Sequence, residues 1–188
     1  MGKGINIAEN VLINKYASYN SVRKPVVFLS HKSEDKDYVE AIGNYLINAG
    51  INIYLDSSDF KLQTAIAKND PKAITDCIQE GISKSDYILC FASQKTVMSW
   101  WVPYEIGYGK RAEKEIATLI RKDVEYIPDF LKIEEILDDI SDLNNFIKKV
   151  TSEHGIPLME KYSWEYSSND YIEKSSNSHT LSKYLNVR

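Results

Sequence analysis

The feature that most constrains this fold is a regular alternation between short apolar runs and longer segments whose apolar residues recur at helical spacing. A short uninterrupted apolar run between polar residues is typical of a strand buried on both faces. Such runs lie at 26–29 and 87–92, and the segments 51–55 and 116–120, each apolar except for one polar residue, are predicted to be strands as well. The segments at 35–50, 73–83 and 101–112 show the helical period. This alternation predicts an α/β fold in which helices cover both faces of a central parallel sheet.

Two further elements are predicted near the end of this alternation. Pro128 interrupts the segment 126–139, but the pattern of 132–137 favours an edge strand. The segment 141–150 has the pattern of a closing helix. With these elements the sheet has about five strands.

The length of 188 residues suits one domain with an addition at each end. We assign 24–150 to the domain. The N-terminal extension, 1–23, has a weak helical pattern in Ile7, Val11 and Leu12, so we predict a helix there. The C-terminal extension, 151–188, is richer in apolar anchors than a flexible linker, so we expect it to pack on the domain or on a partner subunit. These anchors are Trp164, Tyr166, Tyr171, Leu181 and Tyr184.

Composition excludes several classes of protein. Apolar residues make up 43% and charged residues 27% of the chain, which is ordinary for a folded globular protein. The formal net charge of −4 argues against a nucleic-acid partner, which would require a basic surface. No apolar run approaches the roughly 20 residues that span a bilayer, and residues 1–10 lack a signal core. We therefore expect a cytoplasmic protein with no membrane partner.

Cysteine and histidine usage points away from disulfides and metals. Cys77 and Cys90 each lie in an apolar segment, which predicts buried, reduced thiols. His31, His154 and His179 are dispersed, and the sequence contains no zinc-binding motif. We predict no metal site.

Four motifs follow one another along the chain, and three of them end at or follow a predicted strand, where parallel sheets bind ligands. They are Val27-Phe-Leu-Ser-His-Lys-Ser-Glu-Asp-Lys36, Tyr54-Leu-Asp56, Ile82-Ser-Lys-Ser-Asp-Tyr-Ile88 and Ser99-Trp-Trp-Val-Pro-Tyr-Glu105. In this order and spacing the series resembles bacterial TIR domains over 24–150. The resemblance implies a three-layer, flavodoxin-like TIR fold and an enzyme that cleaves the nicotinamide–ribose bond of NAD⁺. NAD⁺ would be the substrate, and no cofactor is expected.

By this resemblance the catalytic residue is Glu105, the glutamate of a Trp-x-x-x-Glu element. Nicotinamide leaves as a neutral base and needs no general acid, whereas the ribose carbon develops positive charge that a carboxylate stabilises. Packing against Trp100 and Trp101 would raise the pKa of Glu105, and ribose hydroxyls or the helix N-terminus would offset that rise. The alternative reading makes Glu105 a solvated helix residue and Trp101 a core residue.

The resemblance also implies a set of residues that bind the substrate. Ser30, His31, Lys32 and Ser33 follow the first strand, where enzymatic relatives contact the dinucleotide. Ser33 could instead cap a helix. The family often has an aromatic residue at the position of His31. The remaining members of the predicted binding set are Asp56 and Trp101.

The segment after Asp56 corresponds to the family's flexible loop, which gates the pocket and mediates contacts between TIR domains. Its usual Pro-Gly signature is missing, and the segment 60–71 is unusually long. We predict a short inserted helix there, and we expect self-association through this loop and the two extensions.

Three functions are compatible with the sequence. The first is an NAD⁺ nucleosidase or ADP-ribosyl cyclase whose product signals to an effector, as in Thoeris-like anti-phage defence, with hydrolysis and cyclisation both open. The second is a non-catalytic TIR adaptor that works by assembly. The third is a nucleoside ribosyl-transferring enzyme, which also places a carboxylate beside a ribose carbon.

Overall fold

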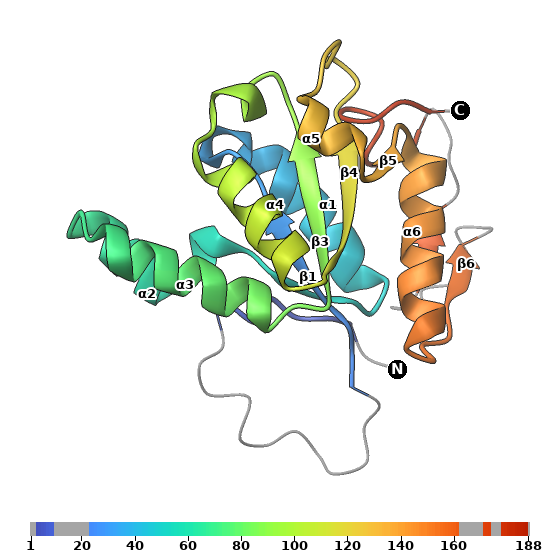
Figure 1. Cartoon of the computed structure of the whole chain (residues 1–188). Coiled ribbons are helices and arrows are strands. Elements are labelled where there is room, and N and C mark those ends of the chain that lie inside the picture. The colour runs from blue at the N-terminus through green and yellow to red at the C-terminus, as the bar shows by residue number, and fades with distance from the viewer. Residues whose placement is uncertain (1–2, 10–22, 162–170, 174–177, 188) are drawn as a thin grey trace.

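The chain forms a five-stranded parallel sheet in the order β2-β1-β3-β4-β5. Figure 1 shows this computed structural model, which describes residues 3–9, 23–161, 171–173 and 178–187. The strands are β1 (Val26–Ser30), β2 (Asn52–Tyr54), β3 (Tyr87–Ala92), β4 (Glu115–Ile120) and β5 (Glu135–Leu137). The α/β, flavodoxin-like arrangement predicted from the alternating pattern is confirmed.

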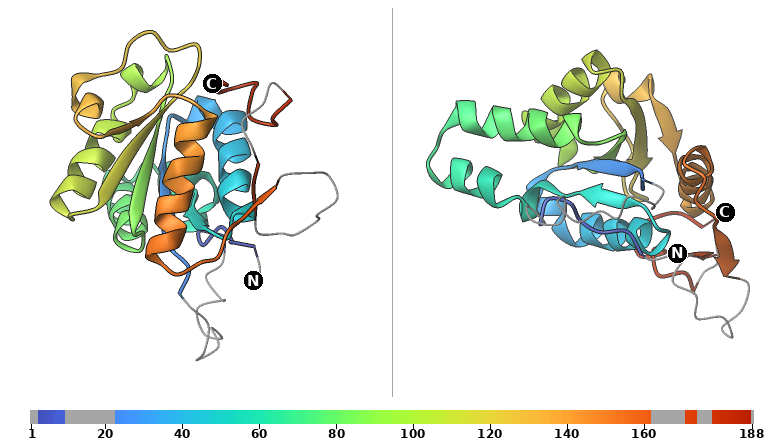
Figure 2. Two further views of the ribbon diagram at one scale, coloured as in Figure 1. Left: turned by 90° about the vertical axis from the view of Figure 1, so that its right-hand side faces the viewer. Right: turned by 90° about the horizontal axis from the view of Figure 1, so that it is seen from below.

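Helices connect successive strands and cover both faces of the sheet (Figures 1 and 2). They are α1 (Lys36–Asn48), α2 (Phe60–Ala67), α3 (Pro71–Ser83), α4 (Trp101–Arg111), α5 (Asp129–Lys132) and α6 (Ile140–Glu153). Short 3₁₀ turns lie at Ser33–Asp35, Asp56–Ser58 and Thr96–Met98. A separate two-stranded parallel sheet pairs β6 (Met159–Lys161) with β7 (Tyr171–Glu173).

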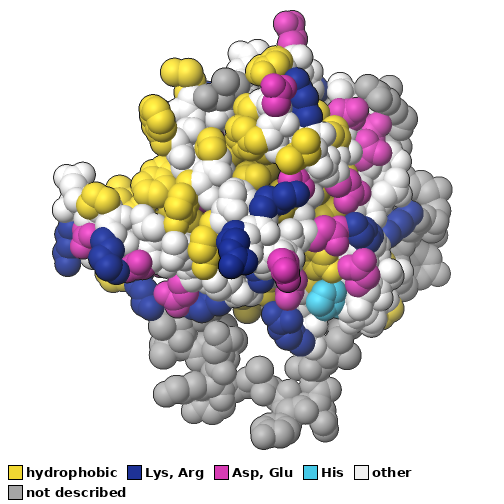
Figure 3. Space-filling model, viewed as in Figure 1, with side chains coloured by type: hydrophobic (Ala, Val, Ile, Leu, Met, Phe, Trp, Pro, Cys, Tyr) yellow, Lys and Arg dark blue, Asp and Glu magenta, His cyan; other side chains and the backbone are white. Residues whose placement is uncertain are grey.

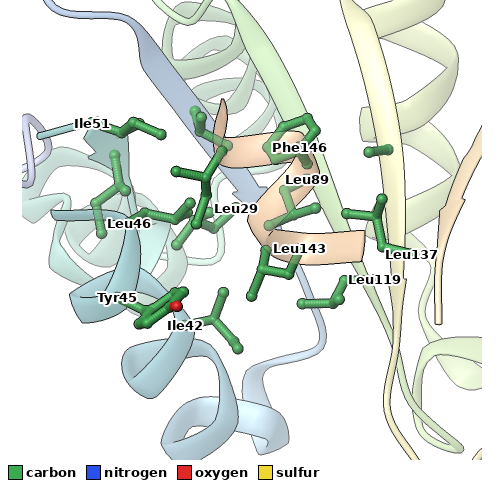
Figure 4. Close-up of a cluster of buried hydrophobic side chains, with 14 of the residues drawn as sticks. Leu29, Ile42, Tyr45, Leu46, Ile51, Leu89, Leu119, Leu137, Leu143 and Phe146 are labelled. Carbon is green, nitrogen blue, oxygen red and sulfur yellow. The ribbon is translucent and has the colours of Figure 1, made fainter. Parts of the chain in front are cut away.

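The continuous apolar strands are explained by two cores, one on each face of the sheet. In β1, Val27 and Leu29 belong to one core, whereas Val26 and Phe28 belong to the other. Alternate side chains of a strand point to opposite faces, so a strand buried on both faces must be apolar throughout. Helices α1 and α6 complete the first core, which Figure 4 shows, and α3 and α4 contribute to the second.

The predicted edge strand at 132–137 is shorter than expected. Residues up to Lys132 belong to α5, which begins directly after Pro128, and β5 starts only at Glu135. Proline fixes its own backbone angle and suits the start of a helix, which explains why this segment begins as a helical turn. The closing helix is confirmed as α6, which Asp139 caps by accepting a hydrogen bond from the Asp142 amide at 2.9 Å.

The unusual segment after Asp56 forms a helical hairpin, α2 and α3, which we call the arm. Its predicted inserted helix is confirmed as α2, where the Asp59 carboxylate accepts from the amides of Lys61 and Leu62. The Asp70 carboxylate caps α3 by accepting a hydrogen bond from the Ala73 amide, and Pro71 lies in the first turn of α3. Figures 1 and 2 show the two helices side by side, extending away from the sheet.

The described part of the N-terminal extension is extended rather than helical. Asn6 forms a parallel bridge with Ile53 of the edge strand β2. The Ile7 amide donates to the Ile53 carbonyl at 2.8 Å, and the Ile53 amide donates to the Ile5 carbonyl at 2.9 Å. Backbone groups of an edge strand need partners, and residues 3–9 supply them. The helix prediction is therefore wrong for this stretch, and its other positions, Val11 and Leu12, lie outside the described residues.

The last described segment, 178–187, packs on the domain. Leu181 and Leu185 are buried in the core beneath α1 and α6, and Tyr184 packs against that core. Asn186 forms a bridge with Asp139 at the start of α6. Trp164 and Tyr166 lie outside the described residues, as does the side chain of Tyr171. Packing on a partner subunit stays a prediction.

Candidate active site

A cavity of about 500 Å³ opens at the carboxyl end of the sheet, where the strand order makes ligand binding expected. One wall follows the strands and carries polar side chains. The opposite wall belongs to the arm and is largely aliphatic. The lining comprises His31, Lys32, Ser33, Lys36, Asp56, Ser57, Leu62, Gln63, Ile66, Asn69, Ile74, Ile78, Ser99, Trp101 and Glu105.

Glu105 lies on the face of α4 that packs against the sheet. Its neighbours on that face, Val102 and Ile106, are buried in the second core, and only 3% of Glu105 is exposed. Its carboxylate accepts a hydrogen bond from the Ser30 hydroxyl at 2.6 Å. Ser30 ends β1 and is itself fully buried. The reading of Glu105 as a solvated surface residue is therefore wrong.

Burial raises the pKa of Glu105 to about 8, and the negative charge of Asp56 contributes to the rise. The hydrogen bond from Ser30 acts in the opposite direction because it favours the charged form. The tryptophans expected to desolvate this carboxylate are not buried around it. Trp100 is 92% exposed and Trp101 is 40% exposed, so the core beneath α4 supplies the desolvation.

His31 and Asp56 face each other within the same cavity. The His31 ring is buried, with Nδ1 2.9 Å from the Leu29 carbonyl oxygen and Nε2 3.5 Å from Asp56 Oδ1. The pKa of Asp56 is raised by burial, whereas the charge of His31 and the Ser57 amide oppose the rise. The structure thus joins the ends of β1 and β2 through an imidazole–carboxylate contact.

Lys32 and Ser33 lie towards the open side of the cavity. The Lys32 ammonium is 3.8 Å from the Glu34 carboxylate, and Ser33 is exposed. Neither the 3₁₀ turn that Ser33 begins nor α1 has a side-chain cap, so the capping alternative for Ser33 finds no support. Lys36, which the sequence did not single out, adds a second cation to the lining.

Trp101 begins α4 and lines the cavity. Its ring meets that of Tyr104 edge to face, with 5.9 Å between centroids. The Tyr104 hydroxyl accepts a hydrogen bond of 2.6 Å from Gln79 on α3, which ties α4 to the arm. Because Trp101 is substantially exposed, the alternative reading of it as a core residue is wrong.

The aliphatic wall of the cavity is the part that the sequence did not predict. It consists of Leu62 and Ile66 from α2 and Ile74 and Ile78 from α3. The helical spacing of Ile74 and Ile78 in the sequence predicted an apolar helix face, but it did not indicate what that face contacts. Nothing local in the sequence distinguishes a helix face that meets the core from one that lines a cavity.

The described residues were searched for metal-binding clusters, disulfides and membrane-spanning helices. Within 3–9, 23–161, 171–173 and 178–187, no group of three His, Cys, Asp or Glu side chains could hold a metal ion. Cys90 is buried and Cys77 is half-buried, and both are free thiols. None of the described helices is long and apolar enough to span a membrane.

Comparison with known proteins identifies relatives of the chain. It is 25% identical over 113 residues to the probable 3′ cyclic ADP-D-ribose synthase ThsB′ of Bacillus cereus strain MSX-D12, covering 60% of this chain and 57% of that protein. It is 32% identical over 94 residues to the NAD(+) hydrolase TirS of Staphylococcus aureus strain MSSA476, covering 50% of this chain and 31% of that protein. The chain thus spans less than two thirds of the length of either relative.

A solved structure supports the fold, and a family model identifies the family. The TIR domain of the Toll-related receptor TRR-2 from Hydra magnipapillata matches the structure with a TM-score of 0.51 at 17% identity, covering 69% of this chain and 97% of that one. This likeness concerns the fold. A family model described as TIR domain matches residues 27–147, which is more than half of the chain. This protein therefore belongs to the TIR domain family.

Proposed function

We propose that this TIR protein cleaves the nicotinamide–ribose bond of NAD⁺ and that Glu105 is its catalytic residue. The observation that carries the proposal is the Glu105 carboxylate, buried against Ser30 and reaching a cavity at the carboxyl end of the sheet. A buried carboxylate with a raised pKa in a cavity is typical of a functional site. The names of the two curated relatives, a cyclic ADP-ribose synthase and an NAD⁺ hydrolase, support the same chemistry.

In the proposed reaction the bond between the ribose carbon and the nicotinamide nitrogen breaks, and its electron pair goes to the nitrogen. Nicotinamide leaves neutral, and the positive charge passes to the ribose carbon, where ionised Glu105 stabilises it. The cationic nicotinamide ring favours the carboxylate form of Glu105 when substrate binds. A nucleophile then adds to the ribose carbon and releases its proton to solvent.

The two walls of the cavity suit the two kinds of surface that a dinucleotide presents. We assign the phosphates to Lys32, Ser33 and Lys36, which offer cations and a hydroxyl on the open side. We assign a base to Trp101 and the aliphatic wall of the arm, which offer flat and apolar contacts. His31 and Asp56, which line the cavity, then lie beside the ribose with Glu105. Ser30, which does not line it, acts through its hydrogen bond to the Glu105 carboxylate. No cofactor enters this scheme.

The product is proposed to be ADP-ribose or a cyclic form of it. Water as the nucleophile produces ADP-ribose, whereas an atom of the same substrate produces a ring. The name of ThsB′ supports a cyclic product. We propose in addition that this product is made in the cytoplasm and signals to an effector in anti-phage defence, as the family resemblance of the sequence implies. The likeness to TirS supports hydrolysis. Separation of the products by liquid chromatography distinguishes the two.

Self-association is proposed as the way in which the enzyme is switched on. Phe60 and Ile66 on α2 are exposed apolar residues, as are Met98 and Trp100 before α4. Figure 3 shows hydrophobic side chains over the arm and over the region above it. Exposed apolar clusters of this kind mark surfaces that bind other proteins. This observation also favours the second candidate function, a TIR adaptor, in which assembly occurs without nicotinamide release.

The decisive experiment compares wild type with Glu105→Gln, which keeps the size of the side chain and removes its charge. Purified protein is incubated with NAD⁺, alone and with an extract of phage-infected cells, and nicotinamide is quantified. Glu113→Gln is the matched control because Glu113 is exposed just beyond the same helix. We expect release by wild type and the control and a loss of at least about 100-fold in Glu105→Gln. Full activity in Glu105→Gln would exclude the proposed role, and association without any release would favour the adaptor.

A further inference from the structure

Residues 3–9, which we call the strap, lie outside the segment 27–147 that the TIR family model matches. The strap runs beside the edge strand β2 (Figure 2), where the Ile53 amide donates to the Ile5 carbonyl at 2.9 Å. It approaches this closely because residue 4 is a glycine. A Cβ atom on Gly4 would lie 1.8 Å from the Ile51 carbonyl oxygen, which is too close for any other residue at this position.

The Asn6 side chain continues this pairing beyond the last residue of β2. Alternate amides of a strand point to the same side, so the Leu55 amide faces the strap as the Ile53 amide does. Its acceptor is Asn6 Oδ1 at 3.2 Å, and the same atom accepts from the Ala8 amide at 3.2 Å. These two donors fix the orientation of the side-chain amide, whose Nδ2 donates to Glu9 Oε1 at 3.1 Å. Because Asn6 is buried, losing its oxygen would leave amides without a partner, which is costly.

The turn Asp56–Ser58, which follows Leu55, contributes its first two residues to the lining of the cavity. The strap contacts this turn at both ends. Asn6 binds the Leu55 amide immediately before the turn. At the other end, the Ser58 hydroxyl donates to Glu9 Oε1 at 3.2 Å. The strap is therefore bonded to the outer side of a turn whose inner side lines the candidate active site.

Other contacts of the turn are longer or more exposed. Asp56 Oδ1 lies 3.5 Å from His31 Nε2, which is at the limit of hydrogen-bond distance. Gln63 on the arm donates to the Asp56 carbonyl at 3.3 Å, and Gln63 is exposed. Water competes with an exposed hydrogen bond more readily than with a buried one. The buried bond from the Leu55 amide to Asn6 therefore constrains the start of the turn most strongly.

We propose that Asn6 is a positioning residue of the candidate active site, through which the strap fixes the turn Asp56–Ser58 in the geometry that binds substrate. The proposed catalytic carboxylate, Glu105, is bonded to Ser30 at the end of β1. Loss of the Asn6 side chain should therefore weaken substrate binding and leave the chemical step intact. This inference rests on the proposed function for its effect on catalysis, but the order of the turn can be measured without substrate.

Four variants of the full chain test the role of Asn6. Asn6→Ala removes the acceptor, whereas Asn6→Asp keeps an oxygen for both backbone amides and loses only the donor to Glu9. Gly4→Ala displaces the strap from the Ile51 carbonyl without altering the turn. Asn44→Ala is the matched control, because Asn44 is exposed on α1 and lines the same small hollow as Asn6.

Amide hydrogen exchange, followed by NMR without substrate, reports the order of the turn. The Ser58 amide donates to the Leu55 carbonyl at 3.0 Å, so both amides mark the geometry of the turn. In Asn6→Ala we expect them to exchange at least about 10-fold faster than in wild type. The Ile53 amide should stay protected, because its partner is a backbone carbonyl. The strap-displacing variant should accelerate all three amides, and Asn44→Ala should match wild type.

Steady-state kinetics of nicotinamide release distinguish positioning from a role in folding alone. We expect the KM for NAD⁺ to rise by about 10-fold in Asn6→Ala and kcat to stay within about twofold of wild type, because contacts of the turn with the ribose are present before and during bond cleavage. A loss of folded protein would instead lower the apparent kcat and leave KM unchanged. Asn6→Asp should restore KM, whereas Gly4→Ala should raise it.

The outcomes separate this inference from the proposed function. If exchange accelerates as expected but wild type releases no nicotinamide, the control of the turn by Asn6 stands and the proposed reaction fails. If wild type releases nicotinamide through Glu105 but Asn6→Ala has the KM of wild type, the role of Asn6 is overturned. A fall in kcat alone, or a raised KM that Asn6→Asp does not restore, would overturn it as well.

Discussion

The Ser30 hydroxyl at the end of β1 donates a hydrogen bond of 2.6 Å to the Glu105 carboxylate on α4, across 75 residues of sequence. Both side chains are buried, and the carboxylate also reaches the cavity. This hydrogen bond favours the ionised form of Glu105, whereas burial and the charge of Asp56 favour the neutral form. Through this contact, the last residue of β1 lowers the pKa of the proposed catalytic residue.

Ser30→Ala should weaken nicotinamide release by making Glu105 harder to ionise. A hydrogen bond to a charged group contributes about 1.5 to 3 kcal/mol, so at pH 7 we expect release to fall by roughly 10- to 100-fold. The steady-state rate is compared with that of Ser152→Ala, which removes an exposed hydroxyl from α6. Equal rates in the two variants would contradict a role for the Ser30 hydroxyl.

The pH dependence of the reaction should follow the ionisation of Glu105. Since its pKa is raised to about 8 in the free protein, the carboxylate form increases as pH rises through that value. We expect kcat/KM to rise with pH and to level off above about pH 8, because this parameter reports ionisations of the free enzyme. Initial rates measured in buffers of constant ionic strength check this. A profile that is flat from pH 6 to pH 9 would show that ionisation of Glu105 does not limit the reaction.

Stability should depend on pH through the same carboxyl group. Its folded pKa of about 8 lies above the ordinary value of 4.5, so its stabilising contribution is complete below pH 4.5 and is lost as pH rises through 8. Glu105→Gln has no such ionisation. The free energy of unfolding of the variant, relative to wild type, should therefore be higher at pH 9 than at pH 6. Urea unfolding at both pH values provides the comparison, and an unchanged difference would contradict the buried, neutral state of Glu105.

The segment 178–187 should contribute to the stability of the domain. Leu185 is 1% exposed within the core beneath α1 and α6, so Leu185→Ala removes buried apolar volume. Substitutions of this kind cost about 2 to 5 kcal/mol. Thermal or urea unfolding measures the loss, with Lys183→Ala as the control because Lys183 is exposed in the same segment. If Leu185→Ala were as stable as the control, this segment would not be part of the core.

Local patterns in the sequence determined the architecture of the domain. Every residue of β1 and β3 is buried, because both faces of these strands are covered. Such strands consist of consecutive apolar residues, so they can be predicted from the local sequence. The segment 132–137 was only partly predictable, because Pro128 allows a helical turn before the edge strand. The helix predicted for 1–23 was wrong over 3–9, because this stretch forms long-range hydrogen bonds with the edge strand β2 instead.

The motif that contains Glu105 identified the residue from sequence, but only the tertiary structure decided its environment. Burial, the partner Ser30, the opposing charge of Asp56 and the facing imidazole of His31 come from four segments that meet at the carboxyl end of the sheet. The aliphatic wall of the arm meets them there as well. Periodicity and capping act between neighbours in the chain and can be read from it. Desolvation and Coulomb interactions act between groups that are close in space, so the charge of Glu105 depends on contacts that exist only once the chain has folded.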